Sequence, residues 1–240
     1  MKPQSISRVL HGAVRAPDRQ QALLADLDLS PDSVPGSADL HPHVAAWPWR
    51  FEVYHPGLRE VLPSVQAFCS AVIRREQPRR WVSLLGPSGV GKTHVLKQAL
   101  ACLQSAAARG HWKIPTPTGH RGPQMAHLIP AVDLEDFRAA RDYAKYDIIY
   151  IEDIGSGAAL DKGAGAVTRN RIAELLQLRS GKWTLLDANL YRREIEQQID
   201  GRIASRLKRD GSWMVEVPQE VPDFWDREEW AAKKRAKEDA

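Results

Sequence analysis

The sequence has little cysteine and no long apolar stretch, and both shortages narrow the class of protein. Its 240 residues contain two cysteines, Cys69 and Cys102, which lie far apart and lack the spacing of metal ligands. This pattern excludes a disulfide or zinc framework and fits a reducing compartment. No apolar run approaches the roughly 18 residues of a membrane span, and the N-terminus lacks the apolar segment of a secretory signal. We therefore expect a cytoplasmic protein with no membrane partner.

The charge of the chain is nearly balanced overall but uneven along its length. The formal net charge is +4 and the pI is about 9.1, which by itself says little about partners. Residues 162–209, however, hold eleven Lys or Arg against five Asp or Glu. This bias favours contacts with phosphate, either of a nucleotide or of a nucleic-acid backbone, although a solvated surface has the same composition.

Strand and helix patterns alternate from Trp47 onward. Short apolar strands are expected within 81–85, 125–132, 147–153, 182–189 and 212–218, and helical patterns within 56–76, 93–110, 133–146, 168–181 and 191–211. Such alternation predicts an α/β domain with a parallel sheet covered by helices on both faces. We expect this domain over 47–217, a flexible partner-binding arm over 1–46 that is rich in Pro, Asp and Ser, and a charged tail over 218–240.

The most specific motif is "GPSGVGKT", which matches G-x-x-x-x-G-K-[ST] in full between an expected strand and an expected helix. Its glycines allow the backbone to wrap closely, so that successive N–H groups point at phosphate oxygens. Lys92 would place a positive charge on the β- and γ-phosphates, and the Thr93 hydroxyl could ligate Mg²⁺. The motif predicts a nucleoside triphosphate site.

A second motif is "YDIIYIEDIG", a buried strand that ends in Glu152 and Asp153. A carboxylate at this position would meet the Mg²⁺ held by Thr93 if the strand lies near the first one. A third is "TLLDANL", in which Asn189 follows a strand and could hold the attacking water. In "GRIASRLKR", Arg202 and Arg206 lie four residues apart on one helix face.

Together these stretches resemble one branch of the AAA+ ATPases. The order of "LLGPSGVGKTH", "IIYIEDIG", "LLQLRSGKWTLLDANL" and "DGRIASRL" is similar to that of the DnaC/IstB-like family, across about residues 50–217. Members are helicase loaders and transposition helper ATPases, related in fold to the initiator DnaA. The resemblance implies a P-loop NTPase with a five-stranded parallel sheet of order 5-1-4-3-2 and no C-terminal helical lid.

The resemblance also implies roles for individual residues. ATP and Mg²⁺ would be the ligands, with Thr93 and Glu152 on the metal, Glu152 and Asp153 as the Walker B pair, Asn189 as sensor 1 and Arg206, or alternatively Arg202, as an arginine finger acting on a neighbouring copy. The residues implied to bind the nucleotide are Gly86, Pro87, Ser88, Gly89, Val90, Gly91, Lys92, Thr93 and His94.

Two features depart from the family. The usual order of the carboxylates is Asp then Glu, and here it is reversed. Asp153 is therefore one methylene shorter than the usual Glu, which predicts slow hydrolysis. The element that helps relatives to hold single-stranded DNA is reduced here to one expected helix over 133–146. The sequence alone therefore does not decide whether this chain binds DNA directly.

The partner implied is a replicative helicase, with a transposase as the alternative. A small-molecule P-loop kinase and an ATP-binding switch without turnover are the rivals from other classes.

Overall fold

The computed structural model describes residues 40–76, 81–134, 136, 138–155, 165–209 and 213–238. The arm expected over 1–46 lies outside these residues as far as residue 39. Its last part is packed rather than free, because Pro42–Ala45 form the short helix α2 and Val44 is fully buried in the core. The packed domain therefore includes residues that precede the expected boundary at Trp47.

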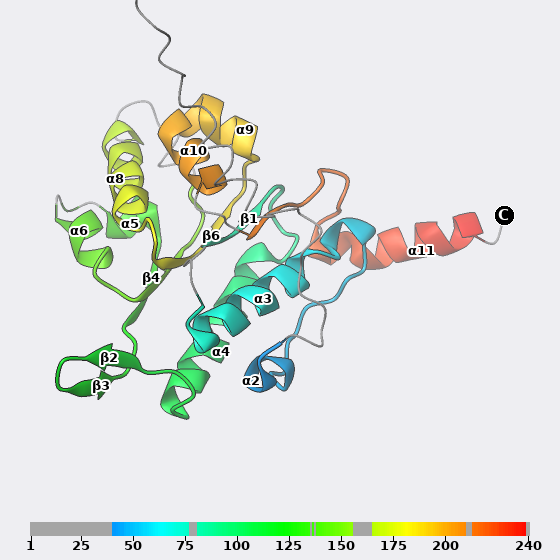
Figure 1. Ribbon diagram of the computed structural model, residues 1–240. Coiled ribbons are helices and arrows are strands. Elements are labelled where there is room, and N and C mark those ends of the chain that lie inside the picture. The colour runs from blue at the N-terminus through cyan, green and yellow to red at the C-terminus, as the bar shows by residue number, and fades with distance from the viewer. Residues whose placement is uncertain are drawn as a thin grey trace, which may run out of the picture. The chain divides into compact units, whose positions relative to one another are not determined.

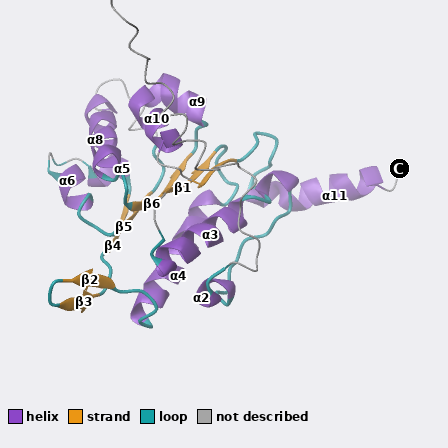
Figure 2. Cartoon of the chain, in the orientation of Figure 1, coloured by secondary structure: helices purple, strands orange, loops and turns teal. Residues whose placement is uncertain are grey.

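The described chain alternates strands and helices (Figures 1 and 2). Its elements are α2 (Pro42–Ala45), η2 (Pro56–Leu58), α3 (Val61–Arg74), β1 (Trp81–Leu85), α4 (Lys92–Ala108), β2 (Ile114–Thr116), β3 (Gly119–Arg121), β4 (Met125–Leu128), α5 (Pro130–Asp133), α6 (Ala139–Tyr143), β5 (Ile148–Ile151), α8 (Gly165–Leu178), β6 (Trp183–Ala188), α9 (Arg192–Glu194), η3 (Ile195–Ile199), α10 (Gly201–Arg209), β7 (Trp213–Glu216), η4 (Phe224–Asp226) and α11 (Arg227–Glu238).

The main sheet has the spatial order β4-β5-β6-β1-β7, and all four pairings are parallel. When its five strands are numbered among themselves along the chain, the order from the β7 edge is 5-1-4-3-2. This confirms the expected topology. The separate antiparallel hairpin β2–β3 lies between α4 and β4 in the chain.

Alternation along the strands builds two cores, one on each face of the sheet. Residues such as Val82, Ile148 and Leu185 face α3 and α4, whereas their neighbours Trp81 and Ile149 face α8 and α10. Because both faces are covered, the central strands β1, β5 and β6 are buried at every position. The carboxyl ends of these three strands meet the start of α4 at one edge of the sheet.

The single helix expected over 133–146 is replaced by two shorter ones, α5 and α6. Pro130 occupies the first turn of α5, where its missing N–H costs nothing, so the helix begins before Asp133. Asp133 is the last residue of α5, and its carboxylate accepts a hydrogen bond from the Ile129 backbone N–H at 2.6 Å.

The segment after β7 is packed against the domain before it becomes the helix α11. Val217 and Val221 are buried, and the Tyr54 hydroxyl donates to the Pro222 carbonyl at 2.7 Å. In Figure 1, α11 then extends away from the sheet. None of the helices in the described ranges is long and apolar enough to cross a bilayer.

Arg179, which follows α8, is fully buried and ties that helix to the sheet. Its guanidinium donates to the carbonyls of Tyr146, Asp147 and Trp183 and to the Thr184 hydroxyl. These acceptors lie where β5 and β6 begin. A planar fork with several donors can satisfy such a set of buried acceptors, which an aliphatic side chain cannot.

We predict that Arg179→Met lowers the free energy of unfolding by about 2–4 kcal/mol, because it leaves buried carbonyls without donors. Urea denaturation of the purified protein measures this change. Arg59→Met, at an exposed position, is the matched control and should stay within about 0.5 kcal/mol of wild type. Equal effects of the two substitutions would contradict the role given to Arg179.

Candidate nucleotide-binding site

The loop between β1 and α4 contains the predicted phosphate-binding residues in one continuous turn. Gly86, Gly89 and Gly91 have φ values of 120°, 75° and 93°, which disfavour any side chain. At Gly89 an added Cβ would also lie 1.8 Å from a carboxylate oxygen of Asp223. Val90 is buried beneath the loop and anchors it. The backbone is therefore free to present its N–H groups to a phosphate.

Lys92 lies under this loop with 4 % of its surface exposed. Its Nζ donates to the carbonyls of Gly86 at 3.0 Å and Pro87 at 2.5 Å, and to Asn189 Oδ1 at 3.0 Å. Burial lowers the pKa of Lys92 to about 8, against the opposing influence of the Asp187 and Asp153 carboxylates. A buried ammonium whose protein partners include neutral oxygens is suited to an anionic ligand.

The Thr93 hydroxyl, beside Lys92, donates to Asp187 Oδ2 at 2.7 Å. Asp187 lies on β6 and is 2 % exposed. It also accepts hydrogen bonds from the Tyr150 hydroxyl at 2.9 Å and from the Asp153 backbone N–H at 2.6 Å. Burial, then the charge of Asp187, raises the pKa of Tyr150, so this hydroxyl keeps its proton. Sequence reasoning missed Asp187, although an acid inside a buried strand was a signal of its importance.

Glu152 was expected beside Thr93, but its carboxylate makes other contacts. It binds Lys97 Nζ at 3.1 Å and His127 Nε2 at 2.5 Å, and the His127 ring stacks on Tyr150 with centroids 4.7 Å apart. The longer side chain of Glu thus links α4, β4 and β5. The structure brings Asp187, rather than Glu152, to the Thr93 hydroxyl.

Asp153 and Asn189 lie together, as expected for residues at the ends of neighbouring strands. Asn189 Nδ2 donates to Asp153 Oδ1 at 3.2 Å, so Asn189 bridges Lys92 and Asp153. Asp153 has φ 52°, a left-handed conformation that Asp tolerates better than most residues. Partial burial, followed by the charge of Asp187, raises the pKa of the Asp153 carboxyl.

These oxygens suit Mg²⁺ better than a transition metal. In the described chain there is no cluster of three or more His, Cys, Asp or Glu side chains that could enclose a metal on their own. Mg²⁺ is instead held by one or two carboxylates together with phosphates and water. The Thr93 hydroxyl and the carboxylates of Asp187 and Asp153 therefore fit this ion if a nucleotide completes the shell.

An aromatic cavity of about 710 Å³ opens beside the same loop. Its walls come from two segments near the two ends of the described chain, 49–54 and 224–225, and from the loop itself. His94 also lines it, and the His94 ring nitrogen Nε2 lies 3.0 Å from the Arg50 carbonyl. The volume is suitable for a nucleoside. The aromatic residues are Trp49, Phe51, Tyr54, Phe224 and Trp225. Trp49 and Trp225 thus lie beside the candidate phosphate site.

The segment after β7 is fastened to the loop that forms this cavity. The Phe224 N–H donates to the Gly89 carbonyl at 3.1 Å. Arg227 lies over the Phe224 ring, 4.2 Å from its centroid, and forms an ion pair with Glu52. The beginning of the tail expected over 218–240 is therefore part of the site.

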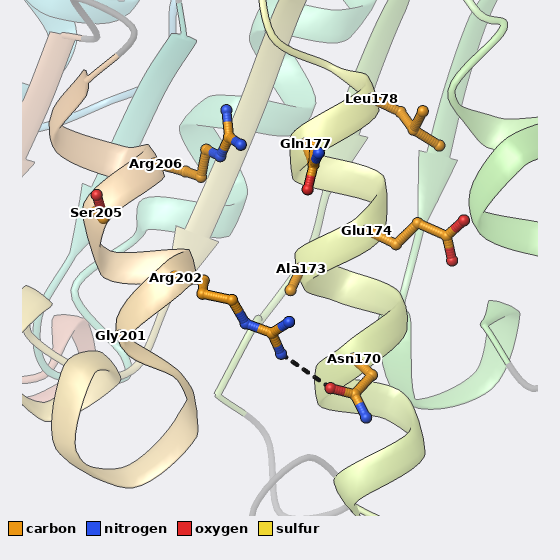
Figure 3. Close-up of a pocket in the computed structure, with 9 residues that line it drawn as sticks. All are labelled: Asn170, Ala173, Glu174, Gln177, Leu178, Gly201, Arg202, Ser205 and Arg206. Atoms are coloured by element: carbon orange, nitrogen blue, oxygen red, sulfur yellow. Dashed lines mark hydrogen bonds between the residues drawn. The ribbon is translucent and has the colours of Figure 1, made fainter.

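Arg206, the expected finger, lies away from these residues in a groove between α8 and α10 (Figure 3). Within the described chain its side chain makes no hydrogen bond or ion pair. Arg202, the alternative, is held by the Asp200 carboxylate and by Asn170 Oδ1 at 2.9 Å. Of the two arginines, Arg206 is the one available to another molecule.

Comparison with known proteins identifies the fold. The chain matches the DnaC helicase loader with a TM-score of 0.50 at 13 % identity, covering 71 % of this chain and 94 % of that one. It matches a DNA replication initiation factor with a TM-score of 0.51 at 15 % identity, covering 77 % of this chain. The replication initiator DnaA bound to AMPPCP and single-stranded DNA gives a TM-score of 0.50 at 16 % identity over 75 % of this chain.

At 13 to 16 % identity, the likeness to these replication proteins is one of fold, a parallel α/β arrangement. The matched region spans about half of the two initiators, 52 % of each, so the likeness concerns one domain of those proteins. No protein-family model matches the sequence, and a search of curated proteins finds no match.

The lowered pKa of Lys92 predicts a pH dependence of nucleotide binding. The ammonium form should bind phosphate, so without Mg²⁺ the affinity should be nearly constant below about pH 7.5 and fall by up to about tenfold per pH unit above about pH 8. Titration with a fluorescent ATP analogue in EDTA between pH 7 and 9.5 measures it. Lys92→Arg keeps its charge throughout and should give a flat profile. A flat wild-type profile would contradict the lowered pKa.

Proposed function

We propose that this chain is a Mg²⁺-dependent ATPase of the AAA+ class that assembles with copies of itself and loads a replicative helicase onto DNA. The burial of Lys92 beneath a loop of three positive-φ glycines is the observation that supports nucleotide binding most strongly. Such a lysine stabilises a polyphosphate by charge and by hydrogen bonds that its carbonyl partners can release. The aromatic cavity beside the loop would take the base and ribose.

Hydrolysis would use the side chains at the ends of β5 and β6. Asp153 would orient or deprotonate the attacking water, and Asn189 Nδ2 donates to its carboxylate at 3.2 Å. Bound Mg²⁺ would offset the charge of the phosphate oxygens. Because Asp153 is shorter than the usual Glu, we expect turnover below about 1 s⁻¹, at the low end for enzymes. A long-lived ATP-bound assembly suits a protein whose useful state is the bound one.

Arg206 has no hydrogen bond or ion pair within the described residues, and this supports assembly with a second copy. It lies in a groove away from Lys92, so it would act on the γ-phosphate of a neighbour rather than on its own. Self-association would then complete each site from two copies.

The loader role is supported by the likeness in fold to a helicase loader. Any contact with DNA would run through Lys and Arg to phosphates, and would therefore be salt-sensitive and independent of sequence.

Mixing two inactive variants tests the proposal. Arg206→Ala keeps an intact Lys92, and Lys92→Ala keeps an intact Arg206. Each alone should lose ATPase activity, whereas an equal mixture should recover about a quarter of the wild-type interfaces if copies assort randomly. Steady-state phosphate release, with and without single-stranded DNA, measures this.

Arg202→Ala is the matched control and should remain active, because Arg202 is already paired within its own chain. A mixture that associates yet stays inactive would contradict action between copies. Nucleotide binding by wild type with no turnover under any condition would favour an ATP-binding switch.

A further inference from the structure

The carboxylate that would anchor the metal is the part of the site at which the sequence-based expectation and the observed contacts of the acids differ. We propose that Asp187 on β6, and not Glu152 after β5, is the carboxylate that positions Mg²⁺ beside Thr93. This inference rests on the proposed function, because Mg²⁺ would enter with the nucleotide. It assigns a positioning role to a strand other than the one that ends in the paired acids.

The first argument is the direction of the Thr93 hydroxyl proton. A hydroxyl that ligates a cation through its oxygen must direct its proton to an acceptor elsewhere. Asp187 Oδ2 is that acceptor, at 2.7 Å. The lone pairs of the Thr93 oxygen are thereby left for a cation, and the carboxylate lies close enough to act on the ion directly or through its water shell.

The second argument is the rigidity of Asp187. Its side chain is almost fully buried and receives hydrogen bonds from α4, from β5 and from the backbone after β5. A group held from three directions can place a metal within the tolerance that phosphoryl transfer demands. The carboxyl of Asp153 lies near it, and a cation between the two would relieve their mutual repulsion.

The third argument is what Glu152 already does. Its two oxygens contact Lys97 and His127, which come from different elements. In this arrangement Glu152 joins α4 to β4 and β5. Its role is to hold the edge of the sheet, and the reversed order of the two acids is then compatible with a complete metal site.

The test compares Asp187→Asn with Glu152→Gln, which removes one charge at each position without changing size. A fluorescent non-hydrolysable ATP analogue is titrated in EDTA and in MgCl₂. In wild type Mg²⁺ should raise the affinity. In Asp187→Asn the ratio of the affinity in MgCl₂ to the affinity in EDTA should be smaller than in wild type by about tenfold or more. Its affinity in EDTA should stay equal to or above that of wild type, because a negative charge near the phosphates is gone. Glu152→Gln should keep the gain.

Retention of the gain by Asp187→Asn, or its loss in both variants, would overturn the assignment. Absence of nucleotide binding by wild type in either buffer would instead overturn the proposed function.

If Asp187→Asn fails to bind in EDTA because it is misfolded, Asp187→Cys provides a second test. Its thiolate selects soft metals, so CdCl₂ should restore the metal-dependent gain in this variant where MgCl₂ does not. No response to Cd²⁺ in Asp187→Cys, or the same response in Glu152→Cys, would overturn the inference.

Discussion

The buried carboxylate of Asp187 sets the geometry of the edge of the sheet at which ligands are expected to bind. A charge in this position is stable only when it is fully hydrogen-bonded, and its donors are Thr93, Tyr150 and the Asp153 backbone. These contacts fix the start of α4 against the ends of β5 and β6. They also place Lys92, the residue before Thr93, within reach of Asn189. Disturbance of this one carboxylate would therefore displace the glycine-rich loop, Thr93 and the side chains of Asp153 and Asn189 together.

Two segments near the ends of the described chain complete the candidate site on its other side. Residues 49–54 and 222–227 meet over the loop, where Phe224 hydrogen-bonds to Gly89 and Arg227 pairs with Glu52. The wall of the aromatic cavity is thus formed by two short segments that are far apart in the sequence. The helix α11 begins at Arg227 and extends from the domain (Figure 1). A conformational change at the loop could therefore be transmitted to this helix through the segment that hydrogen-bonds to Gly89.

What could be predicted from the sequence was local or periodic. The phosphate-binding loop could be recognised because its glycines and Lys92 lie in one short stretch of sequence. The apolar runs and their spacing indicated the strands of the sheet. The order of the sheet followed from the resemblance to a family. Contacts between distant residues could not be predicted in this way: Thr93 and Asp187 are 94 positions apart, and Asp223 lies against Gly89. The contacts of the Glu152 carboxylate depend on Lys97 and His127. The positions of these two residues follow only from the packing of α4 and β4.

Hydrogen exchange measured by mass spectrometry tests the central claim, that the loop and the ends of β5 and β6 form one Mg²⁺–nucleotide site. A non-hydrolysable ATP analogue with Mg²⁺ should slow amide exchange in residues 86–94, 152–155 and 187–190, and in the cavity wall at 49–54, and leave the hairpin β2–β3 unchanged. Protection of the loop without any change at 187–190 would contradict a site organised by Asp187, and no protection in any of these segments would contradict nucleotide binding itself.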